Sequence, residues 1–308
     1  MRTFILKYSL VILVFLIIGL CINNFIINLI NSGIKIDLKW LFEPSGFEIS
    51  ESVLNFSSKN NYIFALLTGW LNSLKVIFCG LILASLIGIS MGILRITKNI
   101  FLNKIASLYI SVIRQIPLLI QLLFWYFVAF LNLPKTPINP LRSLILLSKQ
   151  GVFILGINLS PEFCALLIGL SIYTSAAIAE LVRGGLESVY RGQWEAYRSL
   201  GLSEGEGIRK IIFPQALPAI LPALTSQYLN LAKNSTLAIA IGYPDIYAIS
   251  DTTITQTGRA IEGFVILLLG FTTLNLIIST IMEKINRSIL NKLINRNPTT
   301  SKTNAIKN

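Results

Sequence analysis

The chain is built around apolar runs that are long enough to cross a lipid bilayer. A helix needs about 20 mainly apolar residues to span the hydrocarbon core, and the runs 4–30 and 62–94 both exceed that length. Further apolar runs occupy 114–131, 162–182, 217–241 and 263–282. Backbone groups in lipid must find hydrogen-bond partners within their own segment, which favours helices. We therefore predict an all-α polytopic membrane protein with about six transmembrane helices.

The residue types that are missing exclude several kinds of site. The chain has no histidine, which excludes histidine-based acid–base catalysis, Ser/His/Asp triads and histidine metal sites. Its three cysteines, Cys21, Cys79 and Cys164, each lie inside an apolar run, where thiols usually serve as inert packing residues. We expect no metal site, no disulfide and no cofactor bound by this chain.

The basic residues indicate the orientation of the chain. If the N-terminus lies in the cytoplasm, six spans place most of the 26 lysines and arginines on the cytoplasmic side, as the positive-inside rule requires. Both ends of the chain are then cytoplasmic. The first apolar run is too long for a signal peptide and lacks a small-residue cleavage site, so we expect a retained membrane anchor. The net charge of +12 needs no nucleic-acid partner as its explanation.

One polar segment, 191–222, separates two of the predicted spans. Residues 193–200 can form two helical turns, and Gly201 follows where a left-handed helix end is expected. Ser203 and Glu206 have the spacing of a capping box, which predicts a second short helix. We expect Trp194 and Tyr197 to be exposed, which would make the segment a protein-binding knob. The alternative is an amphipathic loop lying on the lipid surface.

The same segment resembles the cytoplasmic signature loop of the permease subunits of bacterial ABC importers, whose pattern is E-A-A-x3-G-x9-I-x-L-P. Two positions depart from that pattern, because Tyr197 replaces an alanine and Phe213 replaces the leucine. The resemblance implies that the segment couples transport to an ATPase. The implied coupling residues are Glu195, Ala196, Tyr197, Gly201, Ile211 and Pro214.

Longer stretches extend the resemblance to residues 46–281. They include GWLNSLKV, VIRQIPLLIQLLFWYF and PQALPAILPALTSQYLNLAKNSTLAIAIGYPDI, which are similar to the polar amino-acid permease group and its general L-amino-acid branch. The resemblance implies a type I, MetI-like ABC permease core with one extra N-terminal helix. We divide the chain accordingly into an N-terminal anchor and periplasmic segment (1–61), a permease domain (62–287) and a basic cytoplasmic tail (288–308).

The resemblance also implies partners and a mechanism. The chain would pair with a second homologous permease, as a heterodimer rather than a homodimer, and with an ATPase subunit dimer and a periplasmic amino-acid-binding protein in a bacterial inner membrane. The chain itself has no G-x4-G-K-[ST] phosphate loop, so ATP and Mg would be used by the partner and this chain is not an enzyme. Nucleotide-driven motion at 191–214 would switch the membrane cavity between its two facing states.

Polar residues inside spans are candidates for the substrate path, because an amino-acid zwitterion needs a cation for its carboxylate and an acceptor for its ammonium. Simpler interpretations remain: a local ion pair for Glu180 and Arg183, interhelical hydrogen bonds for 234–236, and side chains reaching the membrane surface for Lys75 and Lys233. The candidates are Tyr173, Glu180, Arg183, Lys233, Asn234 and Ser235.

Three other functions are weighed against this one. A secondary transporter would show inverted repeats and interrupted helices, and no internal repeat is visible in the sequence. A membrane enzyme lacks histidine, clustered cysteines and a supply of intramembrane carboxylates. An ABC permease for peptides or inorganic anions remains an alternative, because a permease sequence reports its substrate only weakly.

Overall fold

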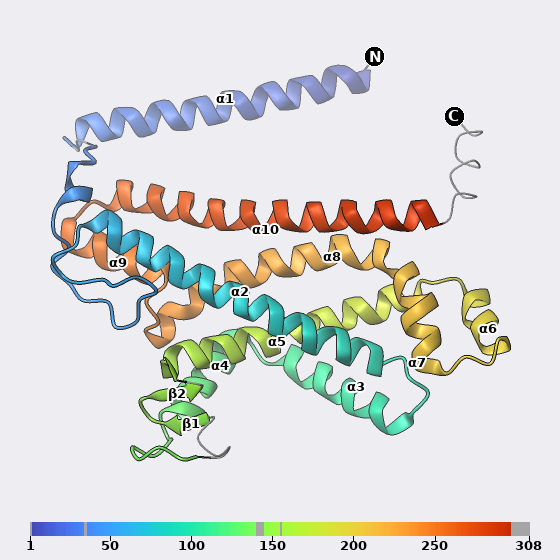
Figure 1. Cartoon of the computed structure of the whole chain (residues 1–308). Helices are drawn as coiled ribbons and strands as arrows, with labels where there is room; N and C mark the ends of the chain where they lie inside the picture. Colours follow the sequence, from blue (N-terminus) through green and yellow to red (C-terminus); the bar gives the residue numbers. More distant parts are fainter. Residues whose placement is uncertain (1, 34–35, 140–144, 155, 297–308) are drawn as a thin grey trace.

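The structure is a computed structural model that describes residues 2–33, 36–139, 145–154 and 156–296. This part of the chain is mostly helical (Figure 1). Four of its helices are long and apolar enough to span a membrane, and a bent helix pair could provide a fifth span. A small antiparallel sheet was not foreseen. Its strands are β1 (Ile145–Ser148), β2 (Gly151–Ile154) and β3 (Ile157–Leu159), in the order β1-β2-β3.

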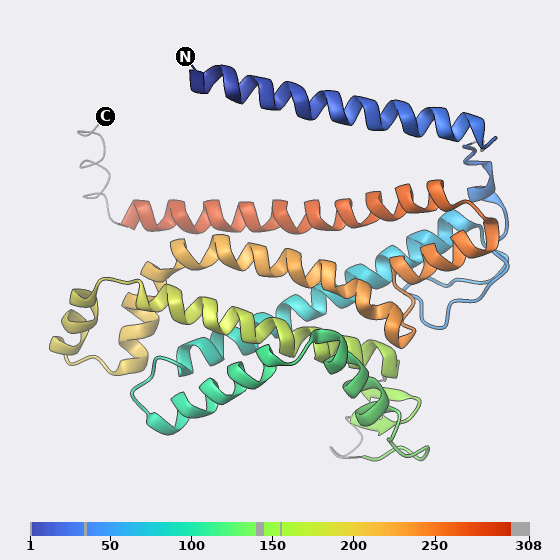
Figure 2. The ribbon, with the colours of Figure 1, turned by 180° about the vertical axis from the view of Figure 1, so that it is seen from behind.

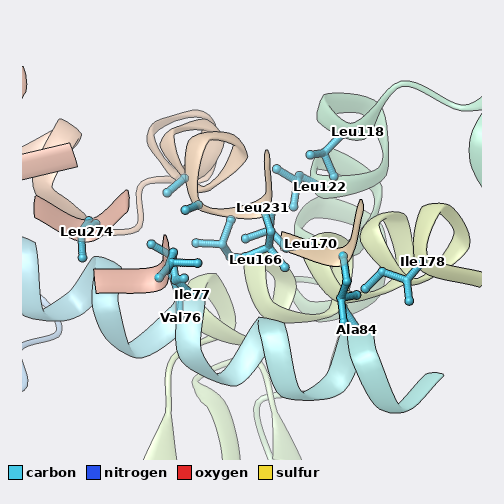
Figure 3. Packing of buried hydrophobic residues seen from close by; sticks show 14 of the residues in the cluster. Val76, Ile77, Ala84, Leu118, Leu122, Leu166, Leu170, Ile178, Leu231 and Leu274 are labelled. Carbon is cyan, nitrogen blue, oxygen red and sulfur yellow. The ribbon is translucent and has the colours of Figure 1, made fainter. Parts of the chain in front are cut away.

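Two helices, α2 (Tyr62–Leu94) and α5 (Pro161–Glu187), form the centre of the bundle. Gly88 and Gly92 of α2 lie so close to α5 that an added Cβ would stand 2.7 Å from Ile178 or Val182. Small residues allow this close backbone approach, which is typical of helix pairs in membranes. Figure 3 shows the packed side chains around this contact, contributed by α2, α4, α5, α8 and α10.

The third predicted span, 114–131, is wrong in its bounds. The helix α3 begins at Ile100 and ends at Gln115, and after Pro117 the chain turns by 102° into α4 (Leu118–Leu123) and the π-helical segment η2 (Phe124–Phe130). The start was missed because polar residues interrupt the apolar pattern of α3. Asn99 caps this helix by accepting hydrogen bonds from the amides of Phe101 and Leu102.

The last two predicted spans correspond to helices with longer bounds, of which α10 but not α8 is among the helices long and apolar enough to span a membrane. The helix α8 (Phe213–Asn234) continues into a 3₁₀ segment, η4 (Ser235–Ile241), and α10 runs from Ala260 to Arg296. Between them α9 (Ile246–Thr257) occupies most of the segment that separates the two apolar runs 217–241 and 263–282. Residues 297–308 of the predicted basic tail lie outside the described residues.

The N-terminal helix α1 (Arg2–Asn31) stands apart from the bundle (Figure 2). None of its membrane-spanning stretch is buried against the rest of the chain. The short 3₁₀ helix η1 (Lys39–Phe42) follows, with Trp40 buried. Here the chain is tied to the bundle, because the amide of Asp37 donates to Glu262 Oε1 at 3.3 Å.

The two ends of the bundle carry different structural elements. We call the end that carries α6 (Arg191–Ser199) and α7 (Glu204–Gly207) the loop end, and the end that carries α9, the sheet and segment 36–61 the sheet end (Figure 1). Helix α1 begins and α10 ends on the same side as the loop end. In this respect the arrangement agrees with an even number of crossings between the two termini.

Candidate functional sites

At the loop end, α6, Gly201 and α7 form a compact projection that we call the knob (191–207). Helix α6 ends at Ser199, and Gly201 follows its C-cap in the predicted left-handed conformation, with φ +71°. The amide of Leu202 donates to the carbonyl of Tyr197 (3.3 Å) and that of Gly201 to Arg198 (3.0 Å), which is the hydrogen-bond pattern of a Schellman motif. The corner between the two short helices is therefore closed by backbone hydrogen bonds and not left loose.

The second short helix starts at the predicted capping box. Ser203 caps α7 by accepting from the amide of Glu206, and the Glu206 carboxylate accepts from Lys210 (2.9 Å) and from the Ser203 hydroxyl (3.0 Å). These donors lower the pKa of Glu206 below its usual value, with Lys210 as the larger cause. The helix does not stop at Gly207. It continues through a π-helical turn, η3 (Ile208–Ile212), into α8, so the knob is joined to a long helix of the bundle without a break.

The prediction that Tyr197 is exposed is wrong. Tyr197 is 1% exposed, and its ring covers Gly207 so closely that a Cβ there would stand 2.2 Å from the ring. The reason is that α6 is amphipathic and turns its aromatic face inward, where Trp194 is half-buried beside Tyr197. The exposed apolar side chains are instead Tyr190 (80%) and Leu200 (73%).

The remaining coupling candidates divide between the surface and the base of the knob. Glu195 and Ala196 are exposed on α6, and Glu195 Oε1 lies 3.3 Å from Arg191 Nε. Ile211 and Pro214 are half-buried where η3 meets α8. The surface offered to a partner therefore carries exposed apolar side chains beside charged ones.

Between α3, α5 and α8 lies an open cavity of about 440 Å³, in whose lining Arg114 and Asn230 are exposed. Its lining holds one guanidinium, three carboxamides and two hydroxyls. The polar residues are Arg114, Tyr173, Thr174, Gln227, Asn230 and Asn234. Two predicted substrate-path residues, Tyr173 and Asn234, are thus brought together, on α5 and α8.

The other four candidates do not line this cavity. Glu180 and Arg183 form a local ion pair at 2.5 Å, and Arg183 also bonds Glu187, which supports the simpler interpretation of these residues. Lys233 is exposed on α8, and buried Ser235 donates to the carbonyl of Ala232 at 2.8 Å.

Arg114, Gln227 and Asn230 were not among the predicted site residues. Arg114 is the first residue of the predicted span 114–131 and was not chosen as a candidate. An arginine three residues before a proline, at the start of an apolar run, was the signal that could have identified it. The two α8 residues repeat the amide chemistry of Asn234 at helical spacing, and that repeat was visible in the sequence.

Lys75 is paired with Glu51 of segment 36–61, and the interpretation that its side chain reaches the membrane surface stays a prediction. Its Nζ lies 2.5 Å from Glu51 Oε1 and 4.2 Å from the centre of the Phe163 ring. Asn72, one turn earlier on α2, donates to the carbonyls of Glu51 and Pro244 at 2.8 Å and accepts from the amide of Val53. Segment 36–61 is therefore fixed onto α2 by polar contacts.

The described part of the chain contains no group of three or more His, Cys, Asp or Glu side chains arranged to hold a metal ion.

Comparison with known proteins places these features in a family. The profile described as "Binding-protein-dependent transport system inner membrane component" matches residues 84–291. The chain is 31% identical to the General L-amino acid transport system permease protein AapQ of Rhizobium johnstonii, over 86% of this chain and 86% of that protein. It is 29% identical to the Glutamate/aspartate import permease protein GltJ of Escherichia coli, over 74% of this chain and 88% of that protein. A solved structure, the crystal structure of an amino acid ABC transporter with histidines, superposes with a TM-score of 0.58 and 29% identity, covering 74% of this chain and 95% of that one.

Proposed function

The chain belongs to the family of binding-protein-dependent transport system inner membrane components, and on this premise we propose that it is the membrane-spanning permease subunit of an ATP-driven amino-acid importer. Membership confirms the resemblance drawn from the signature loop. The observation that carries the proposal is the match of the permease family profile to residues 84–291. These residues form a multi-helix bundle with the knob at one end. The amino-acid substrate rests on the similarity to relatives named as amino-acid permeases.

The knob is the proposed docking element for the partner ATPase. It stands at the loop end, which we place in the cytoplasm on account of the excess of basic residues there. Glu195 and Ala196, with the exposed side chain of Leu200, would enter the partner surface. Gly201 sets the angle of α6, and the unbroken path from α7 to α8 would carry the displacement into the bundle.

The cavity between α3, α5 and α8 is the proposed substrate path. Arg114 is the cation in its lining and is the proposed partner of the amino-acid carboxylate, since a guanidinium matches a carboxylate with two parallel hydrogen bonds. Tyr173 and Asn234 supply neutral donors and acceptors for the remaining polar groups. The proposal does not extend to Lys233 or to the Glu180–Arg183 pair, which lie outside the lining.

The proposed assembly contains a second homologous permease, two ATPase subunits and a periplasmic amino-acid-binding protein. ATP and Mg would be used by the ATPase subunits, and this chain would bind no cofactor of its own. Segment 36–61 and the sheet, both at the sheet end, form the proposed contact with the binding protein. Both termini would lie in the cytoplasm of a bacterium, with 1–61 as anchor and periplasmic segment, 62–287 as the permease domain and 288–308 as a basic tail.

The test is uptake by the purified complex in proteoliposomes that enclose ATP. We expect labelled amino acids to accumulate only with ATP and the binding protein present. Arg114→Met should abolish most of this uptake while basal ATP hydrolysis continues, and Lys233→Met, which removes an exposed charge outside the cavity, should leave uptake unchanged. Uptake that persists without ATP and collapses with an ionophore would instead indicate a secondary transporter. Equal activity of both variants would remove Arg114 from the substrate path.

A further inference from the structure

The break between α3 and α4 leaves backbone acceptors without their helical partners. Pro117 has no N–H, so the carbonyl of Ile113 cannot receive the hydrogen bond that an unbroken helix would supply from four residues ahead. Ile116 is extended (φ −97°, ψ 124°), which removes its carbonyl from the helical ladder as well. In a membrane, backbone groups without hydrogen-bond partners are strongly unfavourable, so both acceptors need another donor.

A single side chain satisfies both acceptors. Gln121, one turn into α4, directs its Nε2 back across the break and donates to the carbonyls of Ile113 and Ile116, at 3.0 Å each. Its own backbone amide bonds the carbonyl of Pro117 at 3.2 Å. The main chain of Gln121 is therefore part of α4, and its side chain bonds the end of α3. It is 6% exposed, so both hydrogen bonds are shielded from competition.

We call the two hydrogen bonds from Gln121 to the end of α3 the clasp. The residue that the clasp holds in place is Arg114. In the sequence it lies between Ile113 and Ile116, whose carbonyls Gln121 binds, and it lines the cavity together with Tyr173 and Asn234. On the other side of the break, Leu122 of α4 packs over Gly169 of α5, where a Cβ would stand 2.4 Å from Leu122 Cδ2. The α4 side is thus fixed against α5 by packing, and the α3 side is fixed to α4 by Gln121.

We propose that Gln121 is a positioning residue for transport: its carboxamide holds the α3–α4 break at the angle that presents Arg114 to the cavity. This role rests on the proposed function of Arg114, although the clasp itself can be tested without it. Gln121 need not touch the amino acid. Its loss would allow the end of α3 to turn and would withdraw the guanidinium from the carboxylate.

The first experiment measures uptake by the complete complex. Gln121→Met keeps the length of the side chain and removes both donors. We expect KM for the imported amino acid to rise on the order of tenfold, about the weight of one hydrogen bond between the displaced guanidinium and the carboxylate, with basal ATP hydrolysis unchanged. Gln121→Glu, protonated in this buried position, keeps one donor and should recover part of the effect. Ile120→Met, the exposed neighbour on α4, is the matched control and should behave as the native chain.

The second experiment separates positioning from a general loss of stability. If Gln121 acts through Arg114, then Arg114→Met combined with Gln121→Met should be no worse than Arg114→Met alone. The proposal would be overturned if the double variant showed the product of the two single effects on uptake. It would also be overturned if Gln121→Met had the KM of the native chain.

The third experiment needs no transport. Spin labels at Leu108 of α3 and Phe127 of η2, both exposed, should report one narrow distance in the native complex, a broader and shifted one in Gln121→Met, and an intermediate one in Gln121→Glu. An unchanged distance distribution overturns the clasp even if the protein imports amino acids. Failure of all amino-acid uptake in the native complex would reject the proposed function and leave this measurement standing. If Gln121→Met does not assemble, the Glu variant decides both measurements.

Discussion

Lys75 Nζ lies 2.5 Å from Glu51 Oε1, and the same carboxylate accepts a hydrogen bond from the hydroxyl of Ser160. The three residues come from segment 36–61, from α2 and from the N-cap of α5. One carboxylate thus joins the chain that follows α1 to the two central helices of the bundle.

The first prediction concerns this junction. Lys75→Met leaves Glu51, whose side chain is only 15% exposed, without its cation. Because Lys75 is partly solvated, the expected loss is about 1–2 kcal/mol rather than that of a fully buried pair. Tryptic cleavage after Lys59 in the purified complex should become several-fold faster. Lys75→Met with Glu51→Gln should return cleavage toward the native rate, and cleavage as slow in Lys75→Met as in the native chain would show that the pair does not hold the segment.

The second prediction concerns Gly201. A Cβ at this position meets no atom within 4 Å, so the strain in Gly201→Val comes from the positive φ alone, which is costly for a β-branched residue. Uptake and stimulated ATP hydrolysis should fall sharply while the protein remains in the membrane, and less ATPase should co-purify. Gly205→Ala, at an open position without positive φ, is the control. Normal stimulated hydrolysis in Gly201→Val would refute the coupling role.

The third prediction concerns the buried tyrosine of the knob. The hydroxyl of Tyr197 has no hydrogen-bond partner in the described structure, so Tyr197→Phe should be neutral or slightly stabilising. Gly207→Ala forces a methyl group into the Tyr197 ring and should destabilise the knob by about 1–3 kcal/mol. Hydrogen exchange of 191–207 measures both changes. Equal exchange in the Ala variant and the native chain would mean that the ring does not pack as described.

The fourth prediction concerns pH and Asp245, the N-cap of α9 at the sheet end. Burial raises the pKa of Asp245 from 3.8 to about 7. The folded protein therefore keeps a proton that the unfolded chain has released, and stability should fall as the pH rises from about 4 to 7. Asp245→Asn preserves the cap and should weaken the pH dependence of thermal inactivation between pH 5 and pH 8. Asp251 is exposed on the same helix, and Asp251→Asn should leave that pH dependence unchanged. An unaltered pH dependence in Asp245→Asn would contradict the assignment.

The fifth prediction tests orientation. In a cysteine-free background, a cysteine in place of Lys59 should react with a membrane-impermeant maleimide in intact cells, and a cysteine in place of Lys98 should react only after lysis. Both lysines are exposed, so access to the side chain is not limiting. The reverse pattern would invert the proposed topology.

The sequence alone revealed the helices whose apolar runs are continuous and the turns whose geometry depends on single residues. Gly201 and Ser203 illustrate the second kind, because a left-handed corner and a helix cap are local properties of a few neighbouring residues. The helix α3 was missed because Asn103 and Lys104 interrupt its hydropathy. In this case hydropathy was a poorer guide than the Asn99 cap.

Contacts between distant segments could not be predicted from one sequence. The partner of Lys75 lies 24 residues earlier, and no periodicity connects the two. The cavity was also hidden, because Arg114, Tyr173 and Asn234 belong to three separate helices, α3, α5 and α8, that meet only in the folded bundle. The burial of Tyr197 depends on the absence of a side chain at Gly207, which is a property of the pair and of neither residue alone.

The π-helical turn η3 fixes the phase between the knob and the bundle. A π-helical turn holds one residue more than an α-helical turn, and each residue of an α-helix advances the side-chain direction by about 100°. In a uniform α-helix, one added residue would rotate the knob by about 100° relative to the face of α8 that carries Asn230 and Asn234. The π-helical turn takes up such a residue within a single turn, so the knob and α8 stay in phase. Deleting one residue within 208–212 would let this turn close as an α-helical turn and would leave that phase unchanged.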